Sequence, residues 1–157
     1  MEHESDRAKI LAPPPILAGL CLGVGVFFEH LIPIVQIPDV GFFRIVLSLC
    51  LFTIGGAILF ISLRTLHFYK TSPNPYQSTV ALASTGIYHR TRNPLYVALL
   101  LFMIALAVAS NSIWILIMTG VLFLLLHFGV VKAEEKYLFS KFGNKYEEYK
   151  QQVRRWI

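Results

Sequence analysis

The sequence predicts an all-α integral membrane protein, with four transmembrane helices followed by an amphipathic C-terminal helix on the cytoplasmic side. Of its 157 residues, 55% are hydrophobic and only 15% are charged, whereas soluble domains carry about 25% charged residues. The apolar residues gather in runs that suit a hydrocarbon core about 30 Å thick. The basic residues fall between these runs and after them, in places that put them on one side of a membrane. The length fits a single domain over residues 1–157.

The first two spans are expected over residues 16–32 and 45–63. Three prolines, Pro13–Pro15, precede the first, and proline is well tolerated at a helix start because the first N–H groups have no helical partner. The second run contains no charged residue. It is therefore long enough and apolar enough to cross a bilayer.

The third and fourth spans are expected to form a tight hairpin. No Asp, Glu, Lys or Arg occurs between Asn93 and Val131, and one helix of that length would be about 58 Å long, too long for a bilayer. The polar break is Ser110-Asn111-Ser112. The run is therefore divided into spans over residues 94–109 and 113–131.

The basic residues support this topology. Arg44 alone falls on one side of the expected membrane, and the other 13 of the 14 fall on the opposite side: Arg7, Lys9, Arg64, Lys70, Arg90, Arg92, Lys132, Lys136, Lys141, Lys145, Lys150, Arg154 and Arg155. Basic residues favour the cytoplasmic face, so both termini and the loop 64–93 are expected there. Since topology accounts for these charges, a nucleic-acid-binding surface is the weaker interpretation, and no nucleic-acid partner is expected.

The expected spans also contain small residues. Gly19, Gly23 and the pair Gly55-Gly56 are expected to allow close helix packing. Cys21 and Cys50 both lie in apolar runs, so they are interpreted as small hydrophobic residues rather than a disulfide. The histidines show no metal-ligand spacing, and no metal site is expected.

The C-terminal tail, residues 132–157, has the pattern of an amphipathic helix. Its apolar residues recur every three or four positions: Leu138, Phe142, Tyr146, Tyr149 and Val153. Gly143 is expected to end a first helix. Asn144 is expected to cap a second, with Glu147 three residues later in a capping-box arrangement.

Polar residues gather where the third and fourth spans meet the cytoplasm. Arg92, Asn93 and Tyr96 stand at the start of one span, and Glu134 and Glu135 follow the other, so a hairpin makes them neighbours. Arginine binds a carboxylate in a bidentate manner, and a helix N-terminus favours an anion. A carboxylate accepts hydrogen bonds from a diol or an ammonium group. The set suits a ligand that carries a carboxylate, a cation and a ribose diol.

Five short motifs in this region make the chain recognisable. They are Thr85-Gly86-x-Tyr88, Arg92-Asn93-Pro94-x-Tyr96, Glu134-Glu135-x-x-Leu138, Phe142-Gly143 and Tyr146-x-x-Tyr149. In this order and spacing, over roughly residues 64–157, the chain resembles the membrane methyltransferases of the isoprenylcysteine carboxyl methyltransferase and phospholipid methyltransferase superfamily. It is most similar to bacterial members with an Arg-Asn-Pro-x-Tyr motif, although Asn93 stands where the eukaryotic carboxyl methyltransferases have histidine.

The resemblance implies a methyltransferase that uses S-adenosylmethionine, releases S-adenosylhomocysteine and has no Rossmann fold. The acceptor would be a small or lipophilic molecule methylated on oxygen, sulfur or nitrogen, and the location would be a prokaryotic inner membrane. The implied catalytic residues are Arg92, which would orient or polarise an acceptor carboxylate, and Glu135, which would orient the cofactor. The implied cofactor-binding residues are Tyr88, His89, Arg92, Asn93, Pro94, Tyr96, Glu134 and Glu135.

Other interpretations remain open on the sequence alone. Arg92 could simply mark the inner end of a span, and Glu134 and Glu135 could pair with neighbouring lysines. Tyr146 and Tyr149 fit packing better than ligand binding, while His127 fits either a functional or a packing role. The chain could also be a small four-helix transporter, a non-catalytic membrane interaction protein, or a family member that binds cofactor without transferring methyl groups.

Overall fold

The structure is a computed structural model that describes residues 8–32, 41–74 and 77–157. Arg7 lies outside these ranges, as does most of the expected loop between the first two spans. The helices are α1 (Pro14–Leu31), α2 (Phe42–Phe68), the short η1 (Gly86–His89), α3 (Pro94–Ser110), α4 (Ile113–Leu125), the π-helical η2 (Leu126–Val131), α5 (Lys132–Phe142) and α6 (Asn144–Gln152). No strand occurs in the part of the chain that the structure describes. The expected apolar helices are therefore all present.

Three helical segments are long and apolar enough to cross a membrane. They are α1, α2 and the continuous stretch Ile113–Phe142, in which α4, η2 and α5 follow one another without a break. The apolar helix α3 has 17 residues, at the short end of the range that spans a bilayer. The fold class predicted from composition is thus confirmed as all-helical and suited to a membrane.

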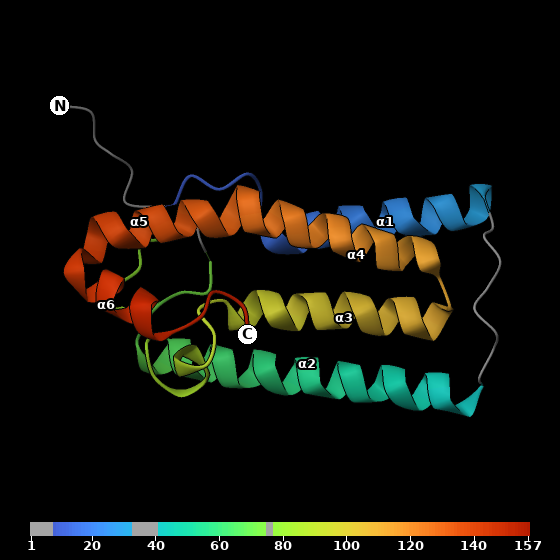
Figure 1. Ribbon diagram of the computed structural model, residues 1–157, viewed down its shortest axis with the longest axis horizontal. Coiled ribbons are helices and arrows are strands. Elements are labelled where there is room, and N and C mark those ends of the chain that lie inside the picture. The colour runs from blue at the N-terminus through green and yellow to red at the C-terminus, as the bar shows by residue number, and fades with distance from the viewer. Residues whose placement is uncertain (1–7, 33–40, 75–76) are drawn as a thin grey trace.

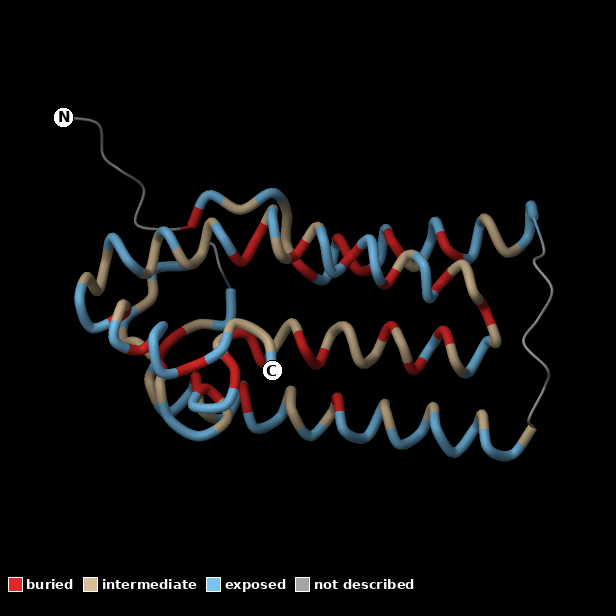
Figure 2. Tube along the Cα trace, in the orientation of Figure 1, coloured by how far each residue is buried: buried red, intermediate tan, exposed pale blue. Residues whose placement is uncertain are grey.

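The long helices lie side by side, with α2 against α3, α3 against α4, and α4 against α1 (Figure 1). The largest core cluster lies between α1, α3 and α4, around the buried side chains of Cys21, Met103 and Leu122. Helix α2 packs on one side only, and most of its residues are exposed (Figure 2). Exposed apolar side chains such as Phe43 and Phe60 suit contact with lipid chains.

Helix α2 is longer than the expected span 45–63 at both ends. Its extensions include Arg44, whose Nη1 donates to the carbonyl oxygen of Ala109 at 2.9 Å, and Arg64, which is exposed. A long basic side chain can extend toward water from a helix end, so a charge does not stop the helix. The loop consequently begins about one turn later than the expected residue 64.

The hairpin between α3 and α4 forms where Ser110-Asn111-Ser112 predicts it. Asn111 takes the left-handed conformation, with φ 52°, and Ser112 caps α4 by accepting a hydrogen bond from the N–H of Ile115 at 3.2 Å. The same hydroxyl donates to Oε2 of Glu29 at 2.5 Å. This contact fixes the end of α1 to the hairpin.

Of the glycines expected to allow close helix packing, Gly55 does so and the others do not. A Cβ on Gly19, Gly23 or Gly56 would meet nothing within 4 Å, whereas one on Gly55 would lie 3.0 Å from the Phe102 ring. The tightest backbone approach is at Gly25, where a Cβ would lie 3.1 Å from the Ile115 Cα. The expectation was therefore wrong for Gly19, Gly23 and Gly56, because their helix faces point away from neighbouring helices.

The difference between Gly25 and Gly23 gives a testable result. We expect Gly25→Ala to lower the free energy of unfolding by about 1–3 kcal/mol, because the added carbon presses on backbone that cannot rotate away. Gly23→Ala should be neutral or raise it by up to about 1 kcal/mol, since alanine favours helix. Thermal unfolding of both variants in detergent measures this. Equal effects at the two positions would contradict the packing of α1 on α4.

The C-terminal tail forms two helices that meet at Gly143, whose φ is +54°. This position favours glycine because a Cβ is disfavoured there. Asn144 is the first residue of α6, Gly143 occupies the cap position, and no side-chain cap bond forms. The expected Asn144 capping box was therefore wrong. Helix α6 ends at Gln152, and the last residues return to the start of α3 (Figure 1).

Candidate active site

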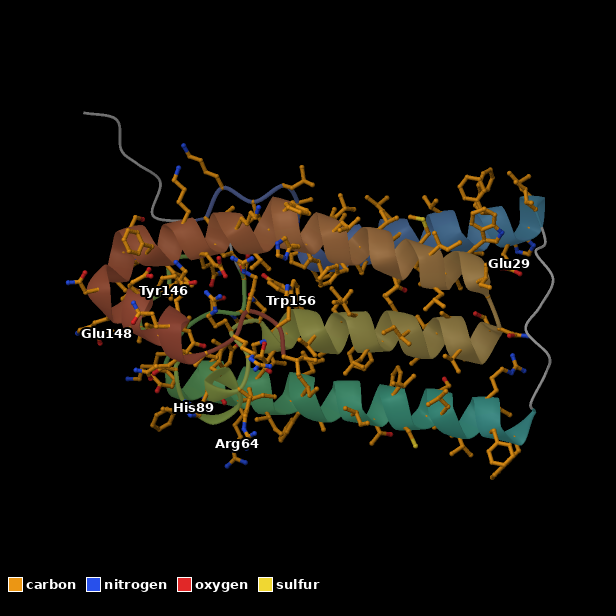
Figure 3. The ribbon with its side chains drawn as sticks, viewed as in Figure 1. Glu29, Arg64, His89, Tyr146, Glu148 and Trp156 are labelled. Carbon is orange, nitrogen blue, oxygen red and sulfur yellow. The ribbon has the colours of Figure 1, made fainter. Side chains whose placement is uncertain are left out.

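A cavity of about 140 Å³ lies at the end of the bundle where α3 begins and α5 continues from η2. Tyr146, His89 and Trp156 are at this end, opposite Glu29 (Figure 3). The polar side chains that line the cavity come from the start of α3, from α5 and α6, and from the preceding loop. They are Thr71, Ser72, Asn74, Thr79, Tyr88, Arg92, Asn93, Tyr96, Glu134, Glu135, Tyr137, Tyr146 and Tyr149.

Arg92 and Glu135 meet in this cavity, as the hairpin predicted. Nη1 of Arg92 lies 3.0 Å from Oε1 of Glu135, and the two side chains are 9% and 15% exposed. Nη1 of Arg92 also donates to the hydroxyl of Tyr146 at 3.4 Å. Nε of Arg92 is buried and has no hydrogen-bond partner among the described residues. Since a buried donor without a partner is costly, this atom indicates where a ligand acceptor would be favourable.

Tyr96 and Glu134, which the hairpin also predicts to be close together, form a second pair. The hydroxyl of Tyr96 donates to Oε1 of Glu134 at 2.6 Å, and both residues line the cavity. The bond orients the Glu134 carboxylate against the first turn of α3. This helix begins at Pro94, which is buried and tolerated there because a residue in the first turn needs no N–H partner.

Asn93 lies in the cavity wall, but its amide serves the protein. Nδ2 donates to the carbonyl oxygen of Arg155 at 2.9 Å, and the backbone N–H donates to Oγ1 of Thr91 at 3.2 Å. These bonds hold the segment that leads into α3. Asn93 therefore connects the start of this helix to the C-terminal segment.

The two loop residues proposed as neighbours of the cofactor lie differently. Tyr88 is buried and lines the cavity, and its carbonyl oxygen accepts a hydrogen bond from the Tyr149 hydroxyl at 2.6 Å. His89 is exposed and is not among the lining residues. Both belong to η1, a 3₁₀ turn of three residues per turn in which successive side chains point about 120° apart. The structure therefore does not bring His89 to the cavity.

Tyr146 and Tyr149 have the packing role that the sequence favoured. They form a buried cluster with Val153, against which Leu138 and Phe142 pack. Burial raises the pKa of Tyr146 to about 12, and the charge of Glu135 acts in the same direction. Burial likewise raises the pKa of Tyr149 and of Tyr88. These hydroxyls therefore remain protonated near neutral pH and can donate hydrogen bonds.

Arg155 was missed as a site residue by the sequence analysis. Its Nε and Nη2 donate to Oε1 and Oε2 of Glu135, each at 2.8 Å. These hydrogen bonds raise the pKa of Arg155, so the side chain stays cationic. The sequence offered only a weak signal, one arginine among many basic tail residues, because the turn that returns the chain to α3 follows from tertiary packing.

His127 is a hydrogen-bonded residue outside the cavity lining. Its Nδ1 accepts from Nε1 of Trp156 at 3.2 Å, and its Nε2 lies 3.3 Å from Nη1 of Arg155. The indole of Trp156 also packs on Phe123, with ring centroids 5.0 Å apart. Of the two roles left open for His127, its contacts therefore support anchoring of the C-terminal segment.

Apolar helices that suit a bilayer, with a cavity lined by charged and apolar residues at one end of the bundle, define an integral membrane protein. A model of the phospholipid methyltransferase family matches residues 43–145. The chain belongs to this family of membrane methyltransferases, which confirms the resemblance drawn from the motifs.

One relative also matches the chain. An uncharacterized protein of Haemophilus influenzae is 37% identical over 65 residues, which are 40% of this chain and the whole of that protein. No solved structure matches the chain significantly.

Proposed function

We propose that the protein is an S-adenosylmethionine-dependent methyltransferase and that the cavity at the start of α3 receives the cofactor. Membership of the phospholipid methyltransferase family supports methyl transfer. The observation that carries the site is the Arg92 guanidinium, which faces this cavity with a buried Nε that lacks a partner among the described residues. The acceptor is a small or lipophilic molecule, methylated on oxygen, sulfur or nitrogen.

The cavity's residues fit the charges of the cofactor. Arg92 was expected to orient an acceptor carboxylate; we propose instead that it binds the carboxylate of the cofactor's amino-acid end, since guanidinium pairs well with carboxylates. Glu134, held by Tyr96, would lie near the cationic groups. Tyr88, Asn93 and Pro94 would form the wall beside them. When bound, S-adenosylmethionine supplies a methyl group already activated by its sulfonium.

The chain's own contribution is positioning and exclusion of water. Holding two reactants in line can raise the rate by several orders of magnitude without a proton-transfer group. We therefore assign no general base. Glu135 was expected to orient the cofactor directly. Both of its oxygens are hydrogen-bonded to Arg155, and one is also paired with Arg92, so we propose that it holds Arg92 instead.

The acceptor is proposed to come from the lipid. Leu66, Leu95 and Leu138 give the cavity an apolar part beside its charged part, which suits an acceptor with a hydrocarbon portion. We further propose four membrane spans, with α3 as the short one, in a prokaryotic inner membrane. The excess of basic residues at one end supports a cytoplasmic location of both termini and of the cavity.

Binding of S-adenosylhomocysteine tests the proposal directly. We expect calorimetric titration of the purified protein in detergent to give saturable binding near one ligand per chain, and free adenine to bind far more weakly. Circular dichroism provides the control that the sample is helical. A helical sample that does not bind S-adenosylhomocysteine would contradict the proposed function.

The role of Glu134 gives a separate prediction. We expect Glu134→Gln to weaken S-adenosylmethionine binding by about ten-fold, because it replaces a carboxyl group proposed to lie near the ligand's cations with a neutral amide. Glu148 lies on α6, is exposed and is not among the lining residues, so Glu148→Gln is the matched control and should bind normally. Titration of both variants measures this, and equal affinities would contradict the assignment of Glu134.

A further inference from the structure

We propose that Arg155 is a positioning residue that keeps Arg92 available for the carboxylate of the cofactor. This inference rests on the proposed function and adds to it a residue from the segment that follows α6. Arg155 lies beyond residues 43–145, the part matched by the family model. Its effect is exerted through Glu135, which lies between the two arginines.

The geometry makes Arg155 the stronger partner of Glu135. Arg155 donates two hydrogen bonds of 2.8 Å, one to each carboxylate oxygen, in the bidentate arrangement that is among the strongest in proteins. Arg92 approaches one oxygen at 3.0 Å. Both carboxylate oxygens are thus held by Arg155, and one of them also contacts Arg92.

The charges of this triad do not cancel. Two guanidinium groups share one carboxylate, so the group carries one net positive charge. Arg92 and Glu135 both line the cavity, whereas Arg155 is not among the lining residues. Glu134 also lines the cavity, with one oxygen already accepting from Tyr96. Removal of Arg155 would leave Glu135 to neutralise Arg92 alone. Because charge interactions strengthen as exposure to water falls, and Arg92 and Glu135 are only 9% and 15% exposed, this change would weaken the attraction for a ligand carboxylate.

Backbone contacts fix Arg155 in place. The carbonyl oxygen of Arg154 accepts from the N–H of Arg92 at 3.0 Å. The carbonyl oxygen of Arg155 accepts from Asn93 at 2.9 Å and from Thr91 at 3.3 Å. The same segment that carries the Arg155 side chain therefore also holds the backbone of Arg92, so the two arginines are placed together.

A pair of ligands separates this role from a merely structural one. S-adenosylhomocysteine carries the amino-acid carboxylate, whereas 5′-methylthioadenosine lacks the whole amino-acid end. We expect Arg155→Gln to weaken S-adenosylhomocysteine binding by about ten-fold and 5′-methylthioadenosine binding by less than about two-fold. Arg155→Lys, which keeps the charge, should restore part of the affinity. The control is Arg90→Gln, since the Arg90 side chain is exposed and is not among the lining residues, and it should bind both ligands as the unaltered protein does.

A measurement without ligand tests the triad itself. Thermal unfolding of Arg155→Gln, Glu135→Gln and the double variant should show non-additive losses, because the two side chains share two hydrogen bonds. Additive losses would overturn the inference. The inference would also be overturned if Arg155→Gln weakened the binding of both ligands equally, or of neither. If the unaltered protein binds S-adenosylhomocysteine normally, either result leaves the proposed function intact. Absence of S-adenosylhomocysteine binding by the unaltered protein would overturn both.

Discussion

Replacing Arg92 with alanine is expected to reduce the affinity for S-adenosylhomocysteine by about 100-fold, the largest effect of any single substitution in the site. The Arg92 side chain is 9% exposed, is paired with Glu135 and lines the cavity. Its loss removes the donor proposed for the ligand carboxylate and also removes the net positive charge of the triad, since Glu135 remains paired with Arg155. Titration of the purified variant measures the change, and methyl transfer should fall at least as far.

Arg90 provides the matched control for this substitution. It lies two residues earlier, is exposed and is not among the residues that line the cavity. Arg90→Ala removes the same charge from the same loop and should leave ligand affinity within about two-fold of the original, as expected for an exposed charge. Unchanged binding in Arg92→Ala, with a helical circular dichroism spectrum, would contradict the assigned site.

Ending the chain after Gln152 is expected to abolish ligand binding and to lower the melting temperature by about 10 °C. The five lost residues contain the buried Val153 and the two hydrogen bonds from Arg155 to Glu135. They also contain the carbonyl acceptors for Arg92 and Asn93, and the Trp156 contacts with His127. Without them, the start of α3 loses the segment that fixes its geometry.

Removal of Ile157 alone is the control for the truncation. Its side chain is 84% exposed, so this shorter deletion should change neither the melting temperature nor the affinity for S-adenosylhomocysteine. Unfolding monitored by circular dichroism and calorimetric titration measure the two quantities. A protein ending at Gln152 that still binds the ligand with full affinity would show that the C-terminal segment does not build the site.

Local sequence patterns were sufficient to bring two groups of polar residues together. A hairpin at Ser110-Asn111-Ser112 makes the far ends of its two helices neighbours, and this predicts that Arg92, Asn93 and Tyr96 lie close to Glu134 and Glu135. The individual pairs, Arg92 with Glu135 and Tyr96 with Glu134, come from the structure. The prediction worked because helix geometry fixes the positions of side chains along two antiparallel helices.

Local sequence patterns predicted less reliably where the helices end and which helix faces contact neighbouring helices. Helix α2 continues through Arg64, because charged side chains at its end reach outward instead of stopping the helix. Gly25, rather than Gly19 or Gly23, makes the close contact with α4. Which face of a uniformly apolar helix meets its neighbour depends on the packing of both helices, and the local pattern does not contain that information.

The sequence by itself determined the class of the protein, because the sorting of apolar and charged residues depends on solvent and not on detailed packing. It determined the apolar helices, the hairpin, and the neighbourhood of Arg92 and Glu134. Only the tertiary structure decided that His89 stays outside the cavity and that Arg155 returns to hold Glu135. The path of the C-terminal segment back to α3 depends on the turn at Gly143, on the buried face of α6 and on the hydrogen bond from Trp156 to His127. Most of these contacts join residues that are far apart in the chain.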